Sequence, residues 1–102
     1  MPFYTIHVKI ALGQINPTVG DFEGNAARII EFARRARDGG AELVVFSELC
    51  VCGYPPRDLV EKPSFVQANC RAASQIAESS RGIAVICGLV TPAQSEDRKS
   101  VV

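Results

Sequence analysis

An amphipathic helical pattern lies between two apolar, β-branched runs in the first half of the chain, and this arrangement restricts the fold most. The first run, Ile6 to Ile15, ends at Asn16-Pro17, where a proline cannot continue a hydrogen-bonded strand. The second, Leu43 to Phe46, is continuous rather than alternating, which is typical of a strand buried on both faces of a parallel sheet. We therefore predict a β-α-β unit and an α/β fold.

The segment between the two runs has the spacing and the ends of a helix. One face is apolar, and it is formed by Ala26, Ile29, Ile30, Ala33 and Ala36. Asp21 can accept hydrogen bonds from the first unpaired amides, and the last turn is rich in arginine, which suits the negative end of the helix dipole. We predict a helix from Asp21 to about Arg37, ended by Gly39-Gly40.

A loop and one or two helices follow the second strand. Ser47 to Arg57 is polar and contains Tyr54-Pro55-Pro56, so we predict a loop at the carboxyl end of that strand. Asp58 to Ser80 is helical in pattern, with Pro63 near a helix start. Its apolar face consists of Phe65, Ala68, Ala72 and Ile76.

The last part of the chain predicts a third strand, from Ile83 to Val90, a polar loop from Thr91 to Lys99, and the beginning of another strand at Ser100 to Val102. A parallel sheet of three strands with two helices leaves an edge open and hardly covers both faces. We therefore expect residues 1–102 to be part of one domain rather than a complete one.

Composition excludes several functional classes. The chain has 102 residues and a formal net charge of zero, which fits one domain and gives no basic surface for nucleic acid. No apolar run reaches the ~20 residues of a membrane helix, and no signal peptide is recognisable, so we expect a cytoplasmic protein. Cysteines without a secretory signal are expected to be reduced, and with His7 as the single histidine no zinc or other metal site is predicted.

Glu48 is the strongest candidate for chemistry. Ligands of open α/β sheets bind beyond the carboxyl ends of strands, and Glu48 follows the second strand by two residues. Its neighbours are mostly apolar, so we expect partial loss of hydration, which would suit a general base. A structural role, capping the next turn or pairing with Arg57, fits the spacing equally well.

Three segments resemble the nitrilase superfamily of carbon-nitrogen hydrolases. Val44 to Leu49 is similar to its hydrophobic-F-P-E-L segment, whose glutamate belongs to a Glu-Lys-Cys triad. Gln14 to Asp21 with Gly24-Asn25, and Gly53 to Leu59, resemble the amino-terminal glutaminase domain of glutamine-dependent NAD(+) synthetases more than other branches. The resemblance covers nearly the whole chain and implies the amino-terminal part of an α-β-β-α sandwich, with three strands and two or three helices.

The resemblance also implies a reaction. In that family a cysteine thiolate attacks the side-chain amide of glutamine, the glutamate is general base and acid, and a lysine stabilises the oxyanion. The ammonia passes to a carboxyl-terminal domain that uses ATP and Mg²⁺ to amidate deamido-NAD. A homo-oligomer is implied for the full-length family. Glu48 matches the base, and Tyr54 matches a tyrosine near the glutamine pocket, although a tyrosine simply wedged into a proline-rich turn fits equally.

The sequence also departs from the family pattern. Ser47 replaces the proline before the glutamate, which removes a restriction on the loop backbone. Cys87 lies inside the predicted third strand, and Lys99 precedes the next strand whereas the family lysine follows it, so neither is assigned a catalytic role.

With Glu48 alone, the 102 residues are expected to be a fragment without glutaminase activity, and no phosphate-binding loop or other cofactor site occurs in them. Two alternatives remain: part of another nitrilase-family amidase, and a non-catalytic interaction module that pairs through its open sheet edge.

Overall fold

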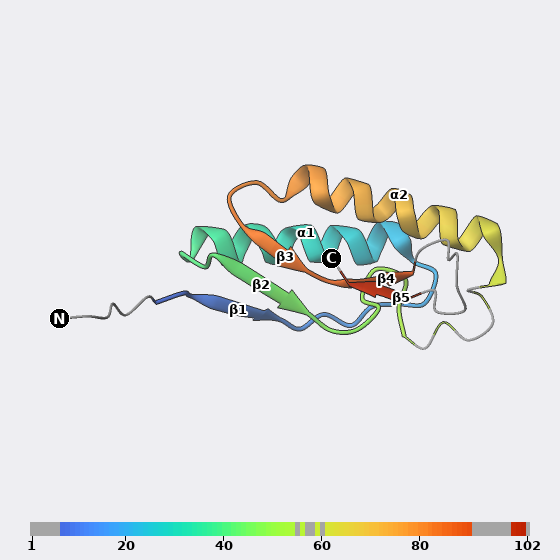
Figure 1. The fold of residues 1–102 in the computed structure, drawn as a ribbon, viewed down its shortest axis with the longest axis horizontal. Coiled ribbons are helices and arrows are strands. Elements are labelled where there is room, and N and C mark those ends of the chain that lie inside the picture. The colour runs from blue at the N-terminus through green and yellow to red at the C-terminus, as the bar shows by residue number, and fades with distance from the viewer. Residues whose placement is uncertain (1–6, 55, 57–58, 60, 91–98, 102) are drawn as a thin grey trace, which may run out of the picture.

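The computed structural model describes residues 7–54, 56, 59, 61–90 and 99–101. Three parallel strands form one sheet in the order β1-β2-β3, and two helices connect them (Figure 1). The elements are β1 (Ile10–Gly13), α1 (Phe22–Asp38), β2 (Leu43–Phe46), α2 (Pro63–Ser79) and β3 (Ala84–Ile86). The predicted α/β fold is confirmed.

Helix α1 agrees with its prediction to within one residue at each end. The Asp21 side chain accepts a hydrogen bond from the Gly24 amide at 3.1 Å, which satisfies one of the unpaired amides of the first turn. At the other end the Gly39 amide donates to the Arg35 carbonyl, and Gly40 has a φ of +91°. Glycine adopts this left-handed backbone without strain, so the chain turns there toward β2.

Helix α2 begins at Pro63, later than the predicted start at Asp58, which lies outside the described residues. Lys62, directly before the proline, has an extended backbone with φ −90° and ψ 120°. A proline ring disfavours the helical conformation of the residue before it, so the helix cannot extend backward through Lys62. Before this point the Leu59 amide donates to the Pro56 carbonyl, and the Lys62 amide donates to the Leu59 carbonyl.

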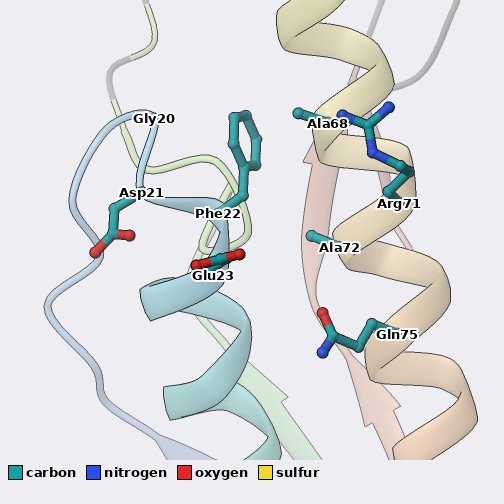
Figure 2. A pocket seen from close by; sticks show the side chains of 8 residues that line it. All are labelled: Gly20, Asp21, Phe22, Glu23, Ala68, Arg71, Ala72 and Gln75. Carbon is teal, nitrogen blue, oxygen red and sulfur yellow. The ribbon is translucent and has the colours of Figure 1, made fainter.

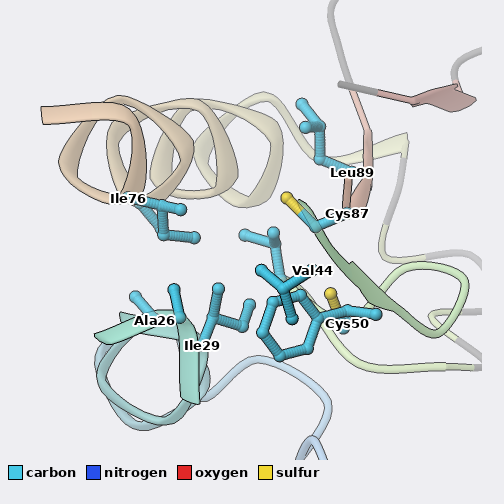
Figure 3. Packing of buried hydrophobic residues seen from close by; sticks show 11 residues of the cluster. Ala26, Ile29, Val44, Cys50, Ile76, Cys87 and Leu89 are labelled. Carbon is cyan, nitrogen blue, oxygen red and sulfur yellow. The ribbon is translucent and has the colours of Figure 1, made fainter. Parts of the chain in front are cut away.

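Both helices lie on the same face of the sheet (Figure 1). Right-handed crossovers that step in one direction, from β1 to β2 to β3, place successive helices on one side. The core between the helices and the sheet is apolar and includes Ile29 of α1, Val44 and Phe46 of β2, and Ile76 of α2 (Figure 3). Gly13 leaves room for the Phe46 ring, which a β-carbon at position 13 would overlap.

The opposite face of the sheet is open. Successive strand residues point to opposite faces, so Ile10 and Leu12 point away from the helices, where they are 53% and 76% exposed. Their neighbours in register, Leu43 and Val45, are only partly buried. The prediction that Leu43 to Phe46 is buried on both faces is therefore correct for the helix side and wrong for the other.

The prediction of one strand from Ile83 to Val90 is also wrong. The chain leaves the parallel sheet after Ile86, and Gly88–Val90 forms β4, which pairs antiparallel with β5 (Lys99–Val101) in a separate two-stranded sheet. Cys87, predicted inside a strand, lies at the junction. The apolar run is continuous in sequence, but where the chain leaves the sheet the backbone at Gly88 packs on the loop after β2.

Candidate functional site

Glu48 lies where the sequence predicts it, two residues beyond the carboxyl end of β2. Its side chain is exposed, as is that of Ser47. The loss of hydration expected from its apolar neighbours is therefore not found in this chain. Glu48 is instead an exposed residue at the sheet edge where the ends of parallel strands meet.

The backbone that follows Glu48 is fixed. Leu49 has a φ of +51°, in the left-handed region that residues with a β-carbon rarely adopt, and is 2% exposed. The next three residues, Cys50, Val51 and Cys52, are each 0% exposed. A strained residue persists only where the surroundings hold it, so the buried loop determines where Glu48 points.

Gly88 supports this loop from the strand side. A β-carbon at Gly88 would lie 2.5 Å from the Leu49 nitrogen and 3.4 Å from the Glu48 α-carbon. The two backbones are thus in contact directly beneath the candidate base. Only a glycine permits this approach without a shift of the loop.

Asn25 ties the loop to the segment after β1. Its amide group donates to the Thr18 carbonyl at 2.8 Å and to the Val51 carbonyl at 3.0 Å, and its oxygen accepts from the Thr18 amide at 2.9 Å. The Gly20 amide also donates to the Cys52 carbonyl at 2.9 Å. Gly53 packs so closely that a β-carbon there would lie 2.6 Å from the Val19 backbone.

The cysteines of the region are reduced and buried. Cys50 and Cys87 lie in the same core cluster, and the nearby Cys87 thiol, together with burial, raises the pKa of Cys50. Burial raises the pKa of Cys52 to about 11. Cys87 is 4% exposed, so a substrate amide has no access to its sulfur. This geometry is consistent with a structural role.

The remaining sequence candidates occupy different places. Tyr54 lies at the end of the Glu48 loop and is 60% exposed. Lys99 is the first residue of β5 rather than part of the preceding loop, and it pairs in register with Val90. Arg57, the alternative partner of Glu48, lies outside the described residues.

A separate groove of about 450 Å³ lies between the first turn of α1 and the middle of α2 (Figure 2). Its polar side chains are those of Asp21, Glu23, Arg71 and Gln75, and neither Glu48 nor Tyr54 lines it. Within the described ranges no three His, Cys, Asp or Glu side chains gather as metal ligands. Among the helices described here, none is both long and apolar enough to cross a bilayer.

Two supporting residues were missed as such by sequence reasoning. Asn25 enters the sequence analysis only as part of the Gly24-Asn25 motif, and Gly88 is not singled out there. A buried asparagine in the first turn of a helix has the same sequence pattern as an exposed one. The spacing of Gly88 behind an apolar run could have indicated a close backbone approach, but it does not identify the partner.

Known proteins are similar to this chain in both sequence and fold. The carbon-nitrogen hydrolase family model matches residues 9–99. The glutamine-dependent NAD(+) synthetase of Thermotoga maritima is 42% identical over 85 residues, which are 81% of this chain and 15% of that protein. The chain thus spans a small part of the curated relatives that it matches.

Solved structures give the same result. The glutamine-dependent NAD(+) synthetase of Acinetobacter baumannii, in complex with ADP, superposes with a TM-score of 0.82 at 32% identity, covering 93% of this chain and 18% of that one. A variant of the amidase from Nesterenkonia sp. AN1, with the acetamide moiety of fluoroacetamide on its active-site cysteine, gives 0.79 at 29% identity, covering 94% and 38%. By sequence and by structure, this chain belongs to the carbon-nitrogen hydrolase family.

Proposed function

We propose that this chain contributes the general base, Glu48, to a glutamine-hydrolysing site that supplies ammonia to an NAD(+) synthetase. The observation that supports this most is the placement of Glu48: the residue is exposed just beyond the carboxyl end of β2, while the residues that follow it are buried. A proton-transfer group must be accessible to substrate and held in one position, and Glu48 meets both conditions.

In this proposal Glu48 accepts the proton of a cysteine thiol as the sulfur attacks the amide carbon of glutamine. It then gives that proton to the departing nitrogen, so that ammonia leaves and a glutamyl thioester remains. Water activated by the same carboxylate releases glutamate. The nucleophilic cysteine and the oxyanion-binding lysine would come from sequence outside these 102 residues, and this chain alone would not release ammonia.

The relatives support the choice of substrate and coupling. Glutamine is favoured because the curated matches are named glutamine-dependent NAD(+) synthetases. ATP and Mg²⁺ would act in the coupled synthetase reaction; the described residues offer no group of ligands for Mg²⁺, so no step is assigned to them here. A cytoplasmic homo-oligomer is part of the same proposal, as is a place for Tyr54 near the bound glutamine.

A second candidate is a simple amidase. The likeness to the Nesterenkonia amidase, at 29% identity and a TM-score of 0.79, favours hydrolysis of a small amide by the same Glu48-assisted step. The two candidates differ in substrate and not in the role of Glu48. A panel of glutamine, acetamide and butyramide separates them.

The test measures ammonia release by two forms: the 102-residue chain and the same chain extended to the next in-frame stop. Each form is measured without a substitution, with Glu48→Gln, and with the control Glu42→Gln. Glu42 is also an exposed glutamate, but it precedes β2 at the opposite end of the strand. Both substitutions remove one carboxylate and keep its shape.

We expect ammonia from the extended form alone, a loss of at least ~10²-fold in kcat with Glu48→Gln, and no change with Glu42→Gln. Full activity of the Glu48→Gln variant would refute the assignment. Ammonia release by the 102-residue form would show that the nucleophile lies within it, and Cys87→Ala would then be tested.

A further inference from the structure

We propose that Asn25 is a positioning residue for Glu48: its side chain clamps the loop that carries the base to the segment after β1. This inference rests on the proposed role of Glu48. Asn25 lies more than twenty residues earlier in the sequence, on α1, and does not act on the substrate. It acts through the position of the loop.

The side chain of Asn25 is fully used. It is 0% exposed, both donor sites of its amide nitrogen are occupied by the Thr18 and Val51 carbonyls, and its oxygen accepts from the Thr18 amide. Arg28 donates to the same oxygen at 3.2 Å. An asparagine amide has two donors and two acceptor sites, so every one is paired and the orientation of the group is determined.

These bonds join three segments, of which the loop after β2 is distant in sequence, with Val51 lying 26 residues from Asn25. Asn25 itself belongs to the first turn of α1, Thr18 to the segment after β1, and Val51 to the loop after β2. Arg28 extends the clamp by donating to the Asn16 carbonyl at 3.0 Å. The site thus has a fixed frame that includes the ends of two neighbouring strands.

The Asn25 hydrogen bonds are close enough to Glu48 to affect the position of its side chain. Val51 follows Glu48 by three residues, and the residues between them are buried, with Leu49 held at a φ of +51°. A shift of the Val51 carbonyl therefore cannot be absorbed by a flexible linker. It is transmitted to Leu49 and so to the carboxylate.

Asn25 is the side-chain part of a wider contact. The Gly20 amide bonds to the Cys52 carbonyl, and Gly53 packs against the Val19 backbone. These are backbone contacts that substitution of Asn25 leaves in place. Loss of the amide should loosen the loop without unfolding it, which makes its effect on catalysis measurable.

The experiment measures glutaminase kcat and KM of the extended protein with Asn25→Ala, Glu48→Asp and both. We expect Asn25→Ala to lower kcat by ~10–10²-fold with KM for glutamine changed by less than ~3-fold, as a misplaced catalytic group does. Glu48→Asp already displaces the carboxylate. In that background Asn25→Ala should cost much less, so the double variant is less than additive.

Two further variants keep the result interpretable. Ile76→Val reduces a buried core side chain on α2 that takes part in none of the Asn25 hydrogen bonds, and it should leave kcat unchanged although it lowers stability. Asn25→Ser introduces a smaller but still polar side chain, and it is used in place of Asn25→Ala if that variant does not fold. The circular dichroism spectrum of Asn25→Ser is compared with that of the unsubstituted protein.

The outcomes separate this inference from the proposed function. If Glu48→Gln retains activity, the role of Glu48 is wrong. If Glu48→Gln is inactive but the Asn25 variants keep full kcat, or their effects add fully to that of Glu48→Asp, Glu48 stands and the positioning role of Asn25 is overturned.

Discussion

Substitution of Gly88 by alanine tests whether the backbone contact beneath Glu48 matters. The added β-carbon would lie 2.5 Å from the Leu49 nitrogen, and ordinary contact begins at 3.4 Å, so the loop must move by about 0.9 Å. Overpacking of this kind costs about 1–3 kcal/mol of stability. A shift of about 1 Å at a catalytic group can reduce turnover by ~10²-fold. We expect the extended protein with Gly88→Ala to fold and to lose about that much of the proposed glutaminase activity.

The assay is steady-state ammonia release by the extended protein, together with its thermal unfolding midpoint. Gly39→Ala is the matched control, because Gly39 has an ordinary φ of −82° and a β-carbon there meets its nearest atom at 3.4 Å. It should retain both activity and stability. Wild-type kcat and an unchanged midpoint in Gly88→Ala would refute the close approach and the idea that Leu49 fixes Glu48.

Two other predictions concern stability and association. The Cys52 thiol has a pKa of about 11 in the fold against 9.0 when unperturbed. Its contribution to the free energy of unfolding is therefore complete below pH 9 and is lost as the pH rises through 11. The expected loss of stability approaches about 3 kcal/mol. Denaturant titrations from pH 8 to 11.5 should show this loss in the unsubstituted chain but not in Cys52→Ala. Identical pH profiles of the two proteins would contradict the prediction. The open sheet face, with Leu12 76% exposed, should make the 102-residue chain self-associate. Leu12→Lys should reduce the sedimentation-average mass of that chain, and a monodisperse monomer without the substitution would count against the prediction.

The sequence pattern predicted helices and strands correctly where short-range interactions determine them. Helix α1 is bounded by its Asp21 cap and its two glycines, and β2 coincides with the apolar run from Leu43 to Phe46. Prediction failed at Ile83 to Val90, where a uniform apolar run contains two strands in different sheets. The break coincides with the close approach of Gly88 to Leu49, and the local sequence does not identify that partner.

The α/β class, the parallel β-α-β units and the position of Glu48 at a strand end can be predicted from sequence, because hydrophobic period and capping act over a few residues. How Glu48 is held depends on contacts between distant segments. The hydrogen bond from Asn25 to Val51 and the approach of Gly88 to Leu49 each join segments tens of residues apart, and they form only once crossover handedness and packing bring those segments together. The exposure of one sheet face likewise depends on where the helices pack.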